Sequence, residues 1–594
     1  MISSINTDKN FGNIEINNNH ENTRQGHSPG FSGGLIDNTI KGIQHCEKNP
    51  MLNVAVIDLS TAIIPRTVWE SFTNIFAGFE AFRRESSGLI INCLLPGFIA
   101  LGAAKLANNT IMGKNVDLSG CWAGNDSINM ISHYYDKAPE TEAYKEGLNK
   151  FKVASKARVY AAHYNMLSDA SGVDGKKTVK FSDIKEFDIS GTAEKLTEAA
   201  FEDKEKIPFS KRLKNSGHTI KNLFAKKCDK KPKTLVEQAF ENAAAQTHIT
   251  ENVKFGHGDN TAVTDLKSAM KNSTGLIHGF IKDNAESSEQ INEFVKKSKK
   301  LVKTKSGIAM AVTIPLAASM QYINRWLTSK MSGVKGAPIY DDYAENMPVI
   351  KKTPEKEKAD KDALLRQKII SIGSMVGVAC LSMMKLPTLS TLKNIVQFKG
   401  QFPTMDQARA ISTVTFSSRM AAADDKNELA ESTVRDIVTF SSMYFLGDYA
   451  AKGYASYLEN TKDVHLLNKT KPVDKNANIL EKAGNWIVNT HLKSTDELKS
   501  DSIRSLKEMK HLRAKCQMVN LGSSLLVLGL LVPVFTRLRT RRNHHNELLA
   551  RQNNTNEAAQ LQDKGIYMKN LKTGSSSSAA FTAFRQRTKE NIKQ

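Results

Sequence analysis

The run from Cys516 to Thr536 constrains this chain more than any other segment. It reads CQMVNLGSSLLVLGLLVPVFT, and none of its 21 residues is charged. An α-helix rises about 1.5 Å per residue, so this run is long enough to cross a hydrocarbon core of roughly 30 Å. The sequence therefore predicts a transmembrane helix here.

Three further runs lack charged residues, at 86–104, 306–324 and 369–384. The first holds Pro96 and Gly97 near its middle, which favours either a kinked span or a re-entrant hairpin. The last is short for a span and would need flanking lysines to reach the headgroups. A buried helix of a large soluble protein is the alternative for each run, but four such runs in one chain favour a membrane protein.

The rest of the chain is too polar to lie in lipid, since the mean hydropathy of the whole sequence is −0.38. We therefore predict a mainly α-helical, multi-span membrane protein with a mostly helical aqueous region and disordered termini. Its expected parts are a disordered tail (1–50), a first hydrophobic region (51–104), a Lys-rich aqueous helical region (105–305), two hydrophobic helices joined by a charged loop (306–384), an amphipathic helical hairpin (385–460), an aqueous region (461–515), the last transmembrane helix (516–536) and a basic, then disordered tail (537–594).

Two local patterns predict element boundaries. Thr404 and Gln407 form a T-x-x-Q pattern after a proline, which is typical of a helix start. A short strand is expected around Thr178 to Phe181, after a turn-rich stretch.

Basic residues beside the spans predict a topology, because Lys and Arg are retained on the cytoplasmic side. Lysines at 296–305 precede the second run, and we place them inside. The proposed determinants after the last span, also placed inside, are Arg537, Arg539, Arg541 and Arg542. This arrangement requires another crossing between about 385 and 515, for which 437–458 is the best candidate. The N-terminus lacks the pattern of a cleavable signal, which favours a bacterial inner membrane.

Lysines and arginines outnumber acidic residues to give a formal net charge of +22, which favours anionic partners. The strongest candidate for binding acidic lipid headgroups is a cluster of lysines next to the second run, although it also serves as a topology signal. Its members are Lys296, Lys297, Lys299, Lys300, Lys303 and Lys305. A second basic cluster, at 225–233, has no interleaved aromatic residues, so we do not expect sequence-specific binding of nucleic acid.

Small residues spaced four apart predict close helix packing within lipid, and they leave a homo-oligomer open. Gly373 and Gly377 form G-x-x-x-G in the third run, and Gly307 and Ala311 repeat the spacing in the second.

Known catalytic, metal-binding and cofactor-binding motifs are absent from the sequence. Asp424, Asp425 and Glu428 lie close enough to act as acid, base or cation ligands, but carboxylates in this pattern also start helices. We therefore expect a non-enzymatic membrane anchor or scaffold whose basic regions contact acidic lipids or protein partners. The alternatives are a transporter or channel component that uses Asp448, and a membrane enzyme without a local signature.

Overall fold

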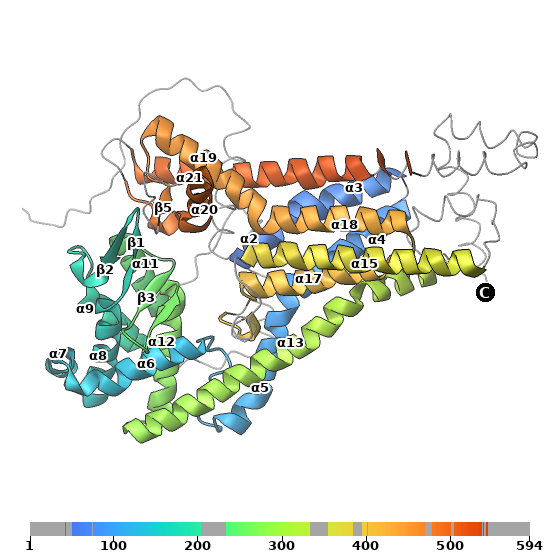
Figure 1. Cartoon of the computed structure of the whole chain (residues 1–594). Helices are drawn as coiled ribbons and strands as arrows, with labels where there is room; N and C mark the ends of the chain where they lie inside the picture. The colour runs from blue at the N-terminus through green and yellow to red at the C-terminus, as the bar shows by residue number, and fades with distance from the viewer. Residues whose placement is uncertain are drawn as a thin grey trace, which may run out of the picture.

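Helices dominate the computed structural model of the chain (Figure 1), as the sequence predicts. The structure describes residues 42, 50–73, 75–202, 233–332, 354–383, 395–400, 402–469, 478–500, 504–536, 538–539 and 542–543. Apart from residues 42 and 50, the predicted disordered N-terminal tail lies outside these residues, as do the C-terminal stretch from about 552 and most of the basic cluster at 225–233.

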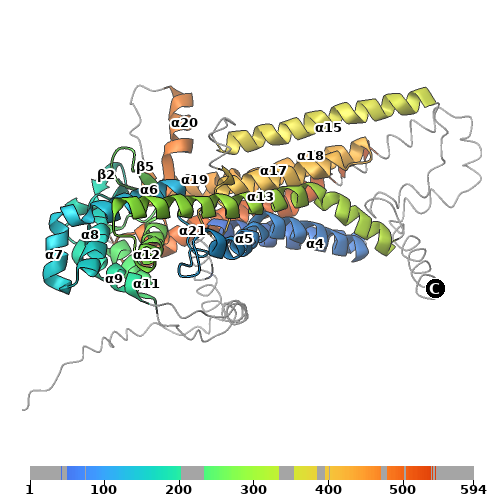
Figure 2. The ribbon, with the colours of Figure 1, turned by 90° about the horizontal axis from the view of Figure 1, so that it is seen from below.

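Long helices lie side by side and form a bundle, as the two views in Figures 1 and 2 show. They are α2 (Pro50–Ile57), α3 (Ile64–Thr73), α4 (Ile75–Leu89), α5 (Leu95–Ile111), α13 (Ser288–Ser332), α15 (Pro354–Met383), α17 (Met405–Ala421), α18 (Lys426–Ser441) and α21 (Leu506–Ser524). Thr404 caps α17 through the predicted capping box with Gln407.

Five helical stretches in the described part of the chain are long and apolar enough to cross a membrane. Four of them contain the runs that the sequence analysis identified. The fifth, Met51–Phe72, was missed because Asp58 and Arg66 interrupt its apolar pattern. The predicted extra crossing at 437–458 is not among the five. The stretches are Met51–Phe72, Gly78–Ile111, Ser288–Met331, Glu357–Met383 and Leu506–Thr536.

Several bundle helices contain a π-helical segment, in which the backbone is wider than in an α-helix. The segments are η1 (Asp58–Ile63), η2 (Ile90–Leu94), η5 (Ser442–Leu446) and η7 (Leu525–Leu531). η2 joins α4 to α5 in one continuous helical stretch, and Pro96 sits in the first turn of α5. The first charge-free run is therefore part of one continuous helical stretch that contains a π segment.

An aqueous domain lies at one end of the bundle (Figure 1). Its helices are α6 (Asn125–Lys137), α7 (Glu142–Phe151), α8 (Ala154–Ser168), α9 (Ile189–Phe201), α11 (Leu235–Thr247) and α12 (Leu266–Lys282), with short 3-10 turns at 138–140 and 181–183. They pack with a four-stranded antiparallel sheet of order β2-β1-β3-β4: β1 (Ser171–Asp174), β2 (Lys177–Lys180), β3 (Val253–Phe255) and β4 (Ala262–Thr264). The strand predicted near Thr178 is β2.

Helix α13 belongs to both parts of the molecule. Phe294 and Leu301 lie in the core of the aqueous domain, whereas Ala309 and Met310 lie in a core of the bundle. The predicted boundary between 305 and 306 therefore falls inside one continuous helix. A rigid helix shared by two cores fixes the aqueous domain relative to the bundle.

A smaller lobe beside the aqueous domain contains α19 (Gly447–Lys462), α20 (Ile479–Asn489), the 3-10 turn η6 (Thr495–Glu497) and the paired strands β5 (Leu467–Lys469) and β6 (Thr490–Leu492). Glu497 links this lobe to the aqueous domain, because one of its carboxylate oxygens accepts from the amides of Thr250 and Glu251, each at 3.1 Å. Asp174 of β1 pairs with Lys493 at 3.1 Å and with Lys499 at 2.6 Å. These contacts attach the lobe to the sheet.

His163 makes the aqueous domain sensitive to acid. The side chain is fully buried on α8, and burial lowers its pKa from 6.5 to about 3. In the unfolded chain the imidazole binds a proton below pH 6.5, while the folded state does not until about pH 3. The free energy of unfolding should therefore fall by about 1.4 kcal/mol per pH unit as the pH drops below 6.5. Denaturant unfolding across pH measures the total slope, and His163→Met should reduce it by about 1.4 kcal/mol per pH unit; an equal slope in wild type and variant would contradict the assignment.

Candidate ion-pair site in the helix bundle

Buried charges from four helices meet inside the bundle. Glu85 on α4 pairs with Arg66 on α3 at 3.2 Å and with Arg419 on α17 at 3.2 Å. Arg419 also pairs with Asp436 on α18 at 3.2 Å. The side chains of Glu85 and Asp436 are 7% and 0% exposed, so solvent does not screen these pairs. With Arg84 and Arg435, which contact Glu85 and Asp436 respectively, these residues form what we call the ion-pair layer.

The α17–α18 hairpin places two members of the layer opposite each other. Its turn is set by Asp425, whose carboxylate accepts from the amides of Asn427 and Glu428 and caps α18. The predicted role of this acidic stretch as a helix start is thus confirmed for Asp425. The turn lets Arg419, near the end of α17, reach Asp436 in the second half of α18.

The ion-pair layer lies within the length of the last charge-free run. Trp69, one turn beyond Arg66, donates through its indole nitrogen to the carbonyl of Gly529 at 3.0 Å. At the other end of the run, Gln517 donates to Asn53 at 2.9 Å. A membrane that accommodates Cys516–Thr536 therefore also encloses Arg66 and its partners. Ionisable groups at such depth are costly unless paired, and they often mark a functional site.

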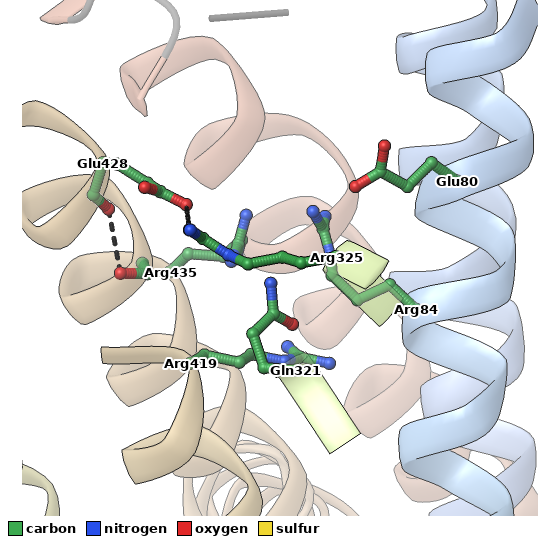
Figure 3. Close-up of a pocket in the computed structure, with 8 residues that line it drawn as sticks. Glu80, Arg84, Gln321, Arg325, Arg419, Glu428 and Arg435 are labelled. Atoms are coloured by element: carbon green, nitrogen blue, oxygen red, sulfur yellow. Dashed lines mark hydrogen bonds and ion pairs between the residues drawn. The ribbon is translucent and has the colours of Figure 1, made fainter. Parts of the chain in front are cut away.

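A small hollow adjoins the layer between α4, α13, α17 and α18, and Figure 3 shows the side chains that surround it. Its volume of about 20 Å³ holds one water molecule but no substrate. Three buried atoms on its lining residues have no hydrogen-bond partner: Glu80 Oε2, Gln321 Oε1 and Arg325 Nε. An ordered water would satisfy such atoms. The lining residues are Glu80, Arg84, Gln321, Arg325, Arg419, Glu428, Ser432 and Arg435.

Arg325 lines the hollow on the side of the α17–α18 turn. Its guanidinium pairs with Glu428 and, at 2.5 Å, with Asp424, which is 74% exposed. Asp424 and Glu428 thus hold an arginine. Asp448 lies more than five helical turns farther along α18, η5 and α19, where it is exposed and accepts from Asn520 at 3.1 Å. The three acids do not share one cavity.

The predicted lysine cluster divides into exposed and buried members. Lys296, Lys300 and Lys303 are exposed, whereas Lys297 pairs with Glu293 at 2.8 Å and Lys299 is half-buried. Lys305 is completely buried. Its ammonium donates to the carbonyl of Cys121 and lies 4.2 Å from the centre of the Trp122 ring. The prediction that Lys305 contacts lipid headgroups is therefore wrong, because the side chain packs inside the protein.

The glycine pairs do not pack helices together within the described part of the chain. A Cβ built on Gly307, Gly373 or Gly377 would meet no atom within 4 Å, and Ala311 is exposed. These small residues face outward, where only lipid or another molecule can contact them.

The two basic clusters lie at opposite ends of the bundle. Arg539 lies against the start of α18, and Asn543 donates to Asn427 at 3.1 Å, close to the site of Arg325. Lys305 lies 20 residues earlier on α13 than Arg325, which corresponds to about 30 Å. A membrane crossed along the axis of this bundle would separate the two clusters, whereas the sequence analysis placed both on the cytoplasmic side; the orientation stays a prediction. Two other proposed determinants, Arg537 and Arg541, lie outside the described residues.

Comparison with family models, with curated proteins and with solved structures gives no match. The site must therefore be interpreted from its own geometry. Sequence reasoning missed the ion-pair layer, because its residues come from four separate helices. The available signals were Arg66 within an otherwise apolar stretch and the Arg83-Arg84-Glu85 triplet directly before a charge-free run.

Proposed function

We propose that this chain is a membrane anchor that holds its aqueous domain in a fixed orientation at one membrane face. The observation that supports this function is α13, one helix of 45 residues that contributes to the cores of both parts. The ion-pair layer supports it as well, since pairing buried charges from four helices favours one arrangement of those helices. A bacterial inner membrane remains our proposal for the location.

The exposed lysines of α13 suggest how the aqueous domain contacts the membrane. Lys296, Lys300 and Lys303 are exposed at helical spacing, directly before the apolar stretch that begins at Ser306. Lysines at this level gain on the order of 1 kcal/mol each from acidic headgroups. We therefore propose that this face binds acidic lipids.

Replacing these three lysines with alanine should lower the number of acidic lipids that stay bound to the full-length protein. Native mass spectrometry in mixed neutral and acidic lipids would measure it, and we expect a loss of affinity of about tenfold or more. The matched control replaces Lys176, Lys177 and Lys180, which are exposed on the β1–β2 hairpin away from the bundle. Equal lipid retention in both triple variants would reject the lysine face of α13 as the lipid site.

A second candidate function is transport, which the ion-pair layer and its hollow favour. Polar groups inside membrane bundles line the routes of ions and protons. The hollow is too small for an organic solute, so the transported species would have to be no larger than a water molecule, such as a proton or a small ion. Asp448, the acid named for this function from the sequence, lies outside the layer.

A further inference from the structure

Asp58 is a buried acid in the apolar part of the first span. The surrounding sequence reads VAVIDLSTAII, and the residue is 9% exposed. In the described part of the chain, none of the ion pairs and hydrogen bonds involves its carboxylate. An ionised carboxylate without such partners is strongly destabilised in an apolar environment, and it becomes neutral by binding a proton.

The neighbours of Asp58 do not compensate a second negative charge. The groups that interact with it electrostatically are Glu85 on α4, Arg66 on α3, Arg419 on α17, Cys93 on η2 and Tyr444 on η5. Both arginines already pair with Glu85. Glu85 also repels a negative charge at Asp58, so the neutral acid fits this environment best.

Asp58 is also the first residue of a π segment. η1 packs against η7 and α4, and four of its six residues are buried, whereas Leu59 and Ser60 are exposed. Single π segments within helices are frequent at functional sites. Within the described part of the chain, Asp58 is therefore both a buried acid without an ion-pair partner and the first residue of a π segment, and these two features do not depend on each other.

Polar side chains lead from the centre of the bundle toward the smaller lobe. Ser442 Oγ lies 3.4 Å from Ser524 Oγ, and Ser524 lies 3.5 Å from the amide oxygen of Asn520. Asn520 donates to the exposed Asp448. Groups of this kind can pass a proton between water and the interior.

The ion-pair layer leads from the centre to the opposite end. Glu85, Arg419 and Asp436 join the layer to the hollow, and the hollow reaches the exposed Asp424 through Arg325. Asp58 interacts electrostatically with members of the ion-pair layer, and the two polar series end at opposite ends of the bundle, at Asp448 and at Asp424.

We propose that Asp58 is a proton-binding site, a buried carboxylic acid that holds a proton and exchanges it with water through these polar routes. Only the O–H bond of this carboxyl forms and breaks, and the proton comes from water and returns to water. The inference rests on the transport function and specifies its ion. It assigns the central position to Asp58 instead of Asp448.

Infrared spectroscopy of the full-length protein in liposomes tests the site. A protonated carboxyl has a C=O stretching band that a carboxylate lacks, and we expect this band at neutral pH in the wild type. Asp58→Asn should remove one component of the band, visible in the difference spectrum between wild type and variant, and Glu140→Gln, the matched control at an acid that is 66% exposed, should leave the band unchanged. A wild type without the band, or an Asp58→Asn variant whose band equals that of the wild type, overturns the proposal. Should Asp58→Asn fail to fold, Asp58→Glu serves instead, because it should shift the band without removing it.

Proton flux in the same liposomes tests the transport function separately. We expect a pH gradient, with potassium and valinomycin balancing the charge, to dissipate faster with the wild type than in protein-free liposomes. Asp58→Asn should reduce this flux to the protein-free rate, and Glu140→Gln, at an acid that is 66% exposed and outside both routes, should leave it unchanged. A band that depends on Asp58 without any flux supports the proton site and rejects transport, whereas flux that is unchanged in Asp58→Asn rejects Asp58 as its carrier.

Discussion

Replacing Glu85 with alanine is expected to destabilise the bundle by about 3–5 kcal/mol, because it leaves two buried arginines without their shared acid. Arg66 and Arg419 each lie 3.2 Å from this carboxylate, and their side chains are 5% and 4% exposed. Neither guanidinium can turn to water without opening the helix packing. Thermal unfolding of the purified protein in detergent, followed by circular dichroism, measures the effect.

A surface pair provides the matched control for Glu85. Glu140 pairs with Lys137 at 2.9 Å, but its side chain is 66% exposed. Glu140→Ala should change the free energy of unfolding by less than about 1 kcal/mol. If Glu85→Ala had an equally small effect, water would have to reach the ion-pair layer in the folded protein.

Replacing Phe280 with alanine is expected to destabilise the aqueous domain by about 3–5 kcal/mol, since it removes a large side chain from a packed core. Phe280 is fully buried on α12. Its ring stacks on Tyr135 of α6 at 4.8 Å and lies 4.7 Å from the ring of Phe294 on α13. Denaturant unfolding of the full-length protein measures the change.

The control for Phe280 is an apolar residue of the same domain that faces solvent. Val263 on β4 is 57% exposed, so Val263→Ala should shift the free energy of unfolding by less than about 0.5 kcal/mol. Because Phe294 belongs to α13, we also expect Phe280→Ala to increase the protease sensitivity of α13. Unchanged cleavage of α13 would mean that the helix is held by the bundle alone.

The sequence determined where the chain is helical and which helices can cross a membrane, because these properties depend on local composition. A run of 21 uncharged residues at 516–536 has few alternatives to a spanning helix. The start of α17 was predictable for the same reason, because the side chains of Thr404 and Gln407 each bond the other residue's backbone amide within one helical turn. The first span, Met51–Phe72, was not predicted because Asp58 and Arg66 interrupt its apolar sequence. Charged residues are costly in lipid unless neighbouring groups pair with them, and the sequence does not show those neighbours.

Only the tertiary structure shows which charged side chains are buried and which residues they pair with. Glu85 and Arg419 are separated by 334 positions in the chain, so no spacing rule connects them. Lys305 belongs to a lysine-rich stretch, yet packing against Trp122 buries it. The two basic clusters, both expected on one side, lie at opposite ends because α13 runs the length of the bundle. The last charge-free run, Cys516–Thr536, belongs to a helical stretch long and apolar enough to span a membrane, as predicted. The structure shows in addition that this run packs beside the ion-pair layer. Whether a charged side chain is buried, and which residue it pairs with, depends on contacts between segments that are distant in the sequence. A local sequence pattern does not reveal these contacts.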